Sequence, residues 1–423
     1  MKTVLMLSRF FPPAFDVGGK RTYRFARYLN RHGWRPVVLT ERLPTDRRID
    51  ETKLDLPPDV ELVREYLPSF GRFYGDAGTD ATNPRPVPSK SGSTSVFRWP
   101  IASDIWLLPR FARMARSLAE RYRPDMIFAS SSPYSALVFG ALLKRRMNVP
   151  LCLDLRDPWS LNFLQEAKPA WARRLDAATE RRLFDYADQV TVTSRSARDA
   201  YRSLYSHLPP GKIECVYNSF DPEQRPEARP KLAADWPIRL VHFGNCYGQR
   251  SLAPVLQAIA ALIGRGELQR EGVRLENYGR LSEADLALAS TLGLSEVLVS
   301  LPAVAYEEGL RRLATADLQV LLGYGEQTLF IPAKLYDYLL SGAPILCVTP
   351  ESELSEMVRN SGRGVCVQQD EAAALEAAIL EATRRGPRPT PTSGGLQADE
   401  LYSANETTRQ LAGLFDALAG PHS

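Results

Sequence analysis

Cysteine and histidine are scarce in this chain, with five and four residues among 423. No two cysteines form a C-x-x-C pair and no histidines an H-x-x-x-H pair, so the sequence has no zinc site of the usual spacing. Most of the cysteines fall in apolar segments, which favours buried free thiols over disulfides. The D-x-D pattern is absent as well. We therefore expect neither a metal nor a cofactor.

Long uncharged segments are also lacking. The one candidate, residues 126–143, is interrupted by Ser-Ser-Ser-Pro, which predicts a strand, a turn and a helix rather than a membrane span. The N-terminal "MKTVLMLSRFFPP" ends in Arg9 and two prolines without a small-residue cleavage site. It predicts a first strand rather than a signal peptide. These absences indicate a cytoplasmic protein.

Positive charge, in contrast, is concentrated near the N-terminus. The net charge is only +4, yet the first fifty residues hold eleven Lys/Arg and four acids. Basic residues near an anionic bilayer favour its binding, so we expect peripheral attachment to the inner face of a membrane. Solvated charge is the alternative, and no nucleic acid partner is expected. The residues concerned are Arg21, Arg24, Arg31 and Arg35 on or just beyond a first helix, and Arg110, Arg113 and Arg116 beside Trp106 and Phe111 on a later one.

Short apolar runs alternate with amphipathic segments almost throughout, a pattern typical of parallel sheets covered by helices. The length suggests two domains. A Pro-rich, charged segment at 222–237 predicts the linker, and the Gly/Ser/Pro-rich residues 75–95 predict an excursion outside the core. We expect domains at 1–222 and 236–400 and a C-terminal helix in 401–423. The predicted strands are 3–8, 36–40, 60–67, 126–130, 150–155, 189–194, 213–218, 238–244, 274–279, 297–301, 318–323, 344–349 and 364–368.

Ligands of open parallel sheets bind beyond the carboxyl ends of the strands, and two glycine-bearing segments fall there. Gly18 and Gly19 open a basic helix after the first strand, where backbone N–H groups could approach an anion. A plain turn is the alternative. Gly244 and Asn245 end the strand 238–243, and Arg250 follows, suiting a diphosphate through its forked donors. A solvated arginine is the alternative there.

Two further segments combine charges at the same kind of position. In "PAKLYDYLLSGAPIL", Pro332 suits a first helical turn, and Lys334 and Asp337 share one helix face. They contact a nucleotide-sugar diphosphate or form a surface ion pair. In "LDLRDPWS", Asp157 and its neighbouring arginine and tryptophan form an acceptor or catalytic site, or a buried Arg–Asp pair that fixes the loop. Asn218 and Asp221 contact ligand or only shape a turn.

These segments together resemble the GT-B glycosyltransferases, specifically the retaining group numbered family four. "FFPPAFDVGGKRTYRFARYLNRHGWRPVVLT" is similar to the family's opening, "CVYNSFDPE" to its "NG-x-D" step, and "LVHFGNCYGQRSL" to its entry into the donor domain. "PAKLYDYLLSGAPIL" resembles the "P-S-K-x-x-E-Y-x-A-x-G-x-P" segment, and "LDLRDPWS" the "D-x-R-D-x-W" segment of members that modify lipid-linked or cell-surface saccharides. The resemblance implies an α/β fold of two Rossmann-like, doubly wound domains facing each other across a cleft, with the C-terminal helix crossing back to the first.

The resemblance also assigns roles. Gly18 and Gly19 would lie near the donor diphosphate, with Gly244 and Asn245 also in the donor site. Arg250 and Lys334 would stabilise the leaving diphosphate, and Asp337 would bind the ribose. The donor is then a nucleotide-sugar and the acceptor a saccharide or lipid-linked saccharide, with no metal.

The sequence departs from the family in two places. Leu329 stands where a first acidic residue is usual, and "ASSSPYSA" has no histidine after the fourth strand. Asp157 is the nearest polar substitute for a catalytic or orienting role. A sugar-nucleotide epimerase is an alternative that would need acid–base carboxylates and a histidine. A catalytically silent nucleotide-binding subunit is a second alternative.

Overall fold

The computed structural model describes residues 1–12, 16–41, 54–66, 100–102, 105–227, 237–246, 250–302, 304–323, 329–384 and 400–420. The chain forms two compact units, Met1–Ser219 with Ala404–Ser423, and Phe220–Ser403. The predicted excursion at 75–95 and most of the predicted linker fall outside the described residues. No helix of the described residues is long and apolar enough to cross a membrane.

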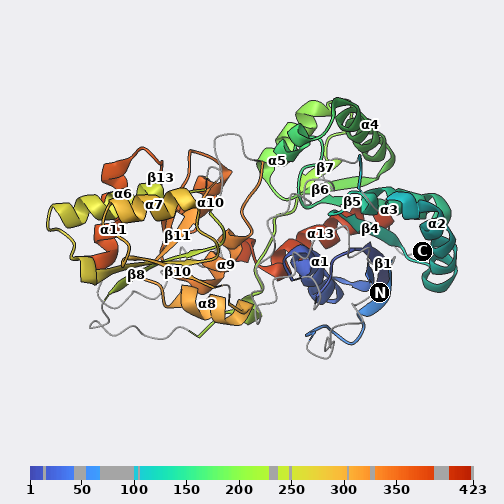
Figure 1. Ribbon diagram of the computed structural model, residues 1–423. Coiled ribbons are helices and arrows are strands. Elements are labelled where there is room, and N and C mark those ends of the chain that lie inside the picture. The colour runs from blue at the N-terminus through green and yellow to red at the C-terminus, as the bar shows by residue number, and fades with distance from the viewer. Residues whose placement is uncertain are drawn as a thin grey trace. The chain divides into compact units, whose positions relative to one another are not determined.

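The first unit is built on a parallel sheet of seven strands in the order β3-β2-β1-β4-β5-β6-β7 (Figure 1). Its central strands are buried on both faces and rich in Val, Leu and Ile, as parallel sheets covered by helices require. The strands are β1 Lys2–Leu7, β2 Trp34–Glu41, β3 Glu61–Tyr66, β4 Met126–Ser130, β5 Leu151–Leu155, β6 Gln189–Val192 and β7 Ile213–Cys215. The helices are α1 Asp16–Tyr28, α2 Leu108–Tyr122, α3 Ser135–Met147, α4 Ala170–Tyr186, α5 Arg195–Leu204 and α13 Ala404–Ala419.

The C-terminal helix α13 belongs to this first unit, as predicted. Its Phe415 packs edge-on against Trp34, with ring centroids 5.4 Å apart, and against Phe128 at 5.9 Å. Leu411 and Ala412 join the same buried core. Residues more than 400 positions from β1 in the chain therefore complete the core around it.

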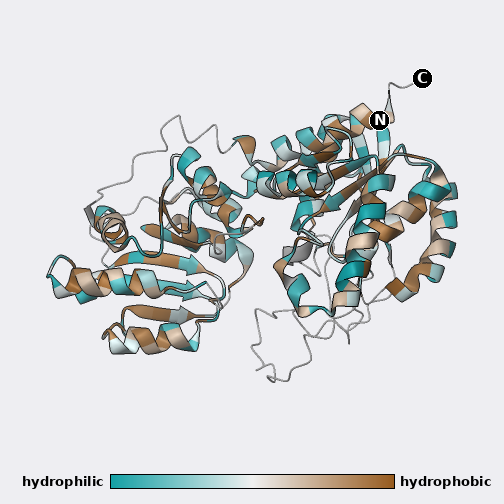
Figure 2. Cartoon of the chain, turned by 90° about the horizontal axis from the view of Figure 1, so that it is seen from above, coloured by the Kyte–Doolittle hydropathy of each residue, from teal (hydrophilic) through white to brown (hydrophobic). Residues whose placement is uncertain are grey.

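The second unit repeats the architecture with six parallel strands in the order β10-β9-β8-β11-β12-β13. In Figure 2 its strands are largely brown, while the helices mix hydrophobic and hydrophilic residues. The strands are β8 Ile238–Phe243, β9 Val273–Tyr278, β10 Leu298–Leu301, β11 Leu318–Leu322, β12 Ile345–Val348 and β13 Gly364–Val367. The helices are α6 Ala253–Gly264, α7 Glu283–Thr291, α8 Tyr306–Ala314, α9 Lys334–Ser341, α10 Glu353–Asn360 and α11 Ala372–Arg384.

Each of the thirteen predicted strands is present, within a few residues of its predicted ends. Helix α9 begins at Lys334, two residues after the predicted start at Pro332. In each sheet the strand order reverses beside the first strand, β1 in one unit and β8 in the other. These switch points are where doubly wound sheets bind ligands, so the segments that follow β1 and β8 are of particular interest.

Candidate functional site

The segment after β8 brings Gly244 and Lys334 together. Gly244 has φ of +134°, and a Cβ at this position would collide with the amine of Lys334. Positive φ and the lack of a side chain are both needed here, so glycine is required. The sequence analysis predicted both residues at the donor site, and the structure places them in contact although 90 positions separate them.

Lys334 and Arg250 form a cation cluster beside Gly244. Burial and the Arg250 charge lower the pKa of the half-buried Lys334 to about 8. Arg250 is itself buried. Within the described part of the chain, the Lys334 ammonium forms no hydrogen bond or ion pair. Two cations at a strand end, one without a countercharge, make a site suited to an anion.

The sequence analysis missed His242, which lies on β8 just before this cluster. Its Nδ1 and the Val320 carbonyl oxygen are 2.8 Å apart, so Nδ1–H donates to that oxygen. Burial and the charges of Lys334 and Arg250 lower the pKa of His242 to about 3, so the ring is neutral. Its Nε2 is buried and has no hydrogen-bond partner among the described residues. The only sequence signal was its position two residues before Gly244.

Asp337 lies one turn further along α9 and is half-buried. The hydroxyl of Tyr306, the first residue of α8, donates to its Oδ1 at 2.8 Å. The tyrosine therefore orients the carboxylate and leaves its second oxygen for another donor. Sequence reasoning missed Tyr306, because nothing in the spacing links residue 306 to residue 337.

Asn245 has a structural task in this segment. Its Oδ1 accepts a hydrogen bond from the backbone N–H of Arg280 at 2.9 Å, and Cys246 N–H donates to the Arg280 carbonyl. The segment after β8 is thereby fixed to the segment after β9. Asn245 thus supports Gly244 from the side, and its predicted contact with a donor stays a prediction.

Gly18 and Gly19, in the first unit, lie inside α1 rather than in a loop before it. Gly19 is buried, and a Cβ there would stand 2.7 Å from the Phe11 Cα and 2.9 Å from the Pro12 Cδ. The glycine lets α1 pack directly on the turn after β1. This packing gives Gly19 a structural reason of its own, beside the predicted proximity to a donor.

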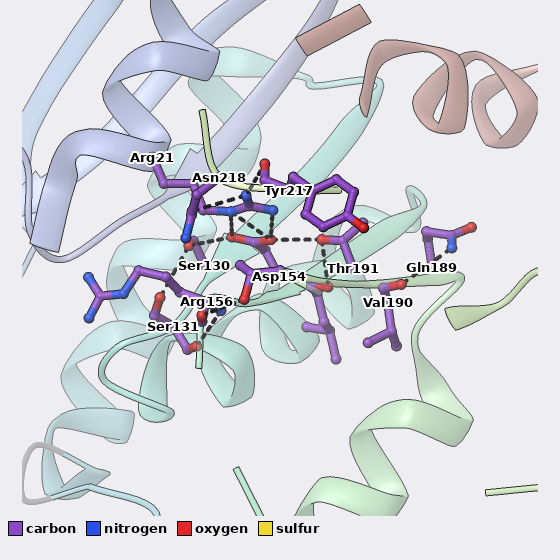
Figure 3. A network of polar contacts seen from close by, with 12 residues as sticks. Arg21, Ser130, Ser131, Asp154, Arg156, Gln189, Val190, Thr191, Tyr217 and Asn218 are labelled. Atoms are coloured by element: carbon purple, nitrogen blue, oxygen red, sulfur yellow. Dashed lines mark hydrogen bonds and ion pairs between the residues drawn. The ribbon is translucent and has the colours of Figure 1, made fainter. Parts of the chain in front are cut away.

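The strongest polar network of the first unit centres on Asp154, at the carboxyl end of β5 (Figure 3). Arg21 of α1 donates to both carboxylate oxygens, with Nη2 2.8 Å from Oδ1 and Nε 3.0 Å from Oδ2. Both side chains are almost completely buried. A buried pair of this kind is stable only when its remaining polar atoms are also satisfied.

The neighbouring elements supply those partners. Ser130 at the end of β4 and Thr191 of β6 each donate a hydroxyl to Asp154, at 2.7 and 2.8 Å. The second Arg21 arm donates to the Tyr217 carbonyl oxygen and to Asn218 Oδ1. This network ties α1 to the ends of three strands and to the end of the first unit. Asn218 serves it, and Asp221 caps a short turn by accepting from Glu223 N–H.

Asp157, in contrast, is 41% exposed and 3.5 Å from the guanidinium of Arg156. The alternative of a buried Arg–Asp pair at this position is therefore wrong, because the buried pair uses Asp154. Trp159 is buried and stacks on Tyr134 with centroids 4.6 Å apart. The tryptophan belongs to the packing of the loop, and Asp157 is left accessible above it.

The arginines of α1 are not the membrane surface that their number suggested. Arg21 and Arg24 are buried, and Arg24 donates to the Ser219 carbonyl oxygen. Phe111 of α2 is buried as well, stacked on Phe139. The prediction fails for α1 because its charges are used inside the unit. The arginines of α2 remain exposed.

Residues 18–219 match the model of the glycosyl transferase 4-like domain. Among solved structures, the chain is similar to HepE of Anabaena in complex with UDP, at 16% identity and a TM-score of 0.62, covering 99% of this chain and 100% of that one. It is also similar to sucrose-phosphate synthase from Thermosynechococcus elongatus, at 17% identity and a TM-score of 0.58, covering 99% and 96%.

Another similar structure is UDP-GlcNAc 2-epimerase from Methanocaldococcus jannaschii, at 12% identity and a TM-score of 0.53, covering 98% and 99%. Identities this low show a shared fold. No curated protein matches the sequence well enough to count as a relative.

Proposed function

We propose that the chain, whose residues 18–219 match the model of the glycosyl transferase 4-like domain, is a glycosyltransferase of the GT-B fold, and that it is a retaining, metal-independent enzyme. In this proposal it moves a sugar from a nucleotide diphosphate donor to a saccharide or lipid-linked saccharide. A nucleotide-sugar donor agrees with the UDP bound to the similar HepE. The enzyme would work in the cytoplasm, at the inner face of a membrane.

The observation that carries this proposal is the cation cluster beside Gly244. A leaving diphosphate gains negative charge in the transition state, and fixed cations in a partly dehydrated site stabilise that charge. Lys334 provides one such cation, and Arg250 provides a second. Gly244 keeps the space next to the lysine amine free of any side chain.

Asp337 suits the ribose of the same donor. Its carboxylate is already oriented by Tyr306, so it can accept hydrogen bonds from sugar hydroxyls without first losing side-chain freedom. On α9, Lys334 and Asp337 are three residues apart and share one face. A phosphate at the lysine and a ribose at the aspartate then correspond to neighbouring parts of one nucleotide.

In the first unit, Asp157 is our candidate for orienting or activating the acceptor, and Gly18 and Gly19 for approaching the donor. Asp157 is accessible at the carboxyl end of β5, whereas Asp154 is fully engaged with Arg21. Arg250 and Lys334 act on the leaving group. Because Asp154 is already paired with Arg21, Asp157 is the carboxylate near the end of β5 that can contact the acceptor.

The direct test is incubation of the purified chain with a panel of nucleotide-sugars and saccharide acceptors, with and without a metal chelator. Transfer with retention at the anomeric carbon, observed by NMR and unaffected by the chelator, is the expected result. Epimerised sugar-nucleotide would indicate the epimerase, and binding without turnover the silent subunit. A preceding thermal-shift screen of nucleoside diphosphates selects the base, since a ligand at 100 times its dissociation constant stabilises by about 2.7 kcal/mol.

A further inference from the structure

Helix α4 exposes a face that is both basic and apolar. Trp171 is 58% exposed, and Leu175, one turn further on, is 43% exposed. Arg174, Arg181 and Arg182 are exposed on the same outward side, because the buried residues of the helix occupy the opposite arc. An exposed tryptophan and leucine flanked by arginines are typical of a helix at a membrane interface.

Helix α2 has a similar outward face. Arg110, Arg113 and Arg116 are exposed on it, and Trp106, which directly precedes the helix, is 70% exposed. The opposite face of α2 is buried through Phe111 and its neighbours. The distribution of buried and exposed positions is therefore the same in both helices.

Helix α3 lies between the two (Figure 1). Phe139 of α3 stacks on Phe111 of α2, with ring centroids 4.3 Å apart. Lys144 of α3 donates to the carbonyl oxygen of Tyr186, the last residue of α4. Helices α2, α3 and α4 therefore form one continuous layer of the first unit.

The arginines on the outward faces of α2 and α4 differ from several other exposed arginines of the described chain. Arg265, Arg311 and Arg409 each form ion pairs with nearby glutamates. The six arginines of the α2 and α4 faces form no ion pair with a described residue. Charges that are not neutralised within the protein produce a positive field available to an external anionic partner.

The exposed aromatic residues also share one edge of the unit. In a parallel α/β layer each crossover helix runs antiparallel to the strands, so its first turn lies at their carboxyl ends. Trp106 precedes the first turn of α2 and Trp171 lies in the first turn of α4. Asp157, at the carboxyl end of β5, belongs to the same edge.

We propose that the outward faces of α2 and α4 dock on an anionic phospholipid bilayer. The arginines meet lipid phosphates, and Trp171, Leu175 and Trp106 enter the headgroup region. The carboxyl edge of the first sheet is then next to the bilayer. A lipid-linked acceptor would reach Asp157 from there, and this last step rests on the proposed function.

A bilayer accounts for these residues better than a nucleic acid does. Arginines alone would serve either partner, since both present phosphates. Leu175 beside Trp171 adds apolar area that a phosphate backbone does not use but an interface does. Competition with RNA is therefore an outcome of the test below.

The test is co-sedimentation of the full chain with vesicles of phosphatidylcholine, with and without phosphatidylglycerol, at low and high salt. Binding should require phosphatidylglycerol and be reversed by salt, because exposed charges are screened. The triple variant R174Q/R181Q/R182Q should bind about a hundredfold more weakly, at about a factor of five per arginine. Leu175→Ser should also weaken binding.

Two matched controls make the result specific. R265Q/R311Q/R409Q removes the same charge from other exposed arginines, and Leu286→Ser removes a leucine of similar exposure, 49%, from α7. Both should bind vesicles like the unchanged protein. The proposal is overturned if the control triple loses as much binding, if neutral vesicles bind equally well, or if RNA displaces the vesicles through the same arginines. If the chain did not bind the vesicles but still bound a nucleoside diphosphate, the docking surface would be rejected and the proposed function would be unaffected.

Discussion

The amine of Lys334 occupies the space that a side chain on Gly244 would need. Lys334 is the first residue of α9, and Gly244 directly follows the last residue of β8. Their contact removes a cation from solvent and puts it near Arg250, which lowers its pKa to about 8. Nothing in folding alone favours two cations so close together, because each raises the cost of charging the other.

Replacing Lys334 by methionine should therefore raise the melting temperature of the ligand-free protein near pH 7. The unfolded chain keeps the lysine proton up to a pKa of about 10.4. The destabilising contribution is thus complete below pH 8 and fades as the pH rises above it. The same variant should bind the nucleoside diphosphate selected by the screen tenfold to a hundredfold more weakly, the value of a charge-assisted hydrogen bond.

Thermal shift with and without ligand measures both effects. Lys144→Met is the control: Lys144 forms an ion pair with Asp188 at 2.6 Å, so its loss should lower the melting temperature. If Lys334→Met lowered the melting temperature and left the affinity for the nucleoside diphosphate unchanged, the cation cluster would not be part of the donor site.

Affinity for the diphosphate should also fall as the pH rises above about 8. The protonated amine binds the anion, and a bound diphosphate raises the lysine pKa, so the complex keeps a proton that the free protein has lost. The dissociation constant then rises by up to tenfold per pH unit. Calorimetric titration at pH 7 and pH 9 detects this, and Lys334→Arg, which stays charged, should lose the dependence. If the dissociation constant depended on pH equally in the unchanged protein and in Lys334→Arg, a group other than Lys334 would be responsible for the pH dependence.

Asp337→Asn should weaken binding of the nucleoside diphosphate and of the free nucleoside, while leaving inorganic pyrophosphate unaffected. The reason is that only the first two ligands carry the ribose. Tyr306→Phe should give the same pattern with a smaller loss, because Tyr306 orients the carboxylate at 2.8 Å and does not itself bind the sugar. Calorimetry with the three ligands separates the cases, and a loss of pyrophosphate binding in Asp337→Asn would contradict the assignment.

The sequence predicted the sheets because parallel strands that are buried on both faces leave uninterrupted apolar runs. It also placed Gly244, Arg250 and Lys334 together, but through family resemblance. Asp154 escaped notice because a lone acid inside an apolar strand carries no signal of its partner, and Arg21 lies 133 positions away. The same holds for Tyr306 and Asp337. Charge counting failed for α1 since it does not distinguish a solvated arginine from one that pairs inside the unit.

Gly19→Ala should lower the melting temperature, because even a methyl group would stand 2.7 Å from the Phe11 Cα. Gly413→Ala is the matched control, a helical glycine in α13 with nothing within 4 Å of the added carbon. It should stabilise the protein by about 0.5–1 kcal/mol through helix propensity. Equal effects of the two substitutions in thermal denaturation would show that α1 does not need this close approach.

Asp154→Asn should be among the most destabilising single changes in the first unit. The guanidinium of Arg21 would remain buried, with its two bonds to the carboxylate replaced by contacts to a neutral amide that also brings N–H groups toward it. Breaking a buried ion pair from one side costs about 3–5 kcal/mol. Asp199→Asn, which removes an exposed acid paired with Arg198, should cost under about 1 kcal/mol.

Urea denaturation of both variants measures the difference. The double replacement Arg21→Met with Asp154→Leu supplies the second half of the argument. If Arg21 and Asp154 serve only to balance each other's buried charge, two apolar side chains should recover much of the stability that Asp154→Asn loses. Recovery will remain incomplete because Ser130, Thr191 and the Tyr217 carbonyl oxygen also lose their partners. An Asp154→Asn protein as stable as Asp199→Asn would mean that the network seen around Asp154 does not stabilise the first unit.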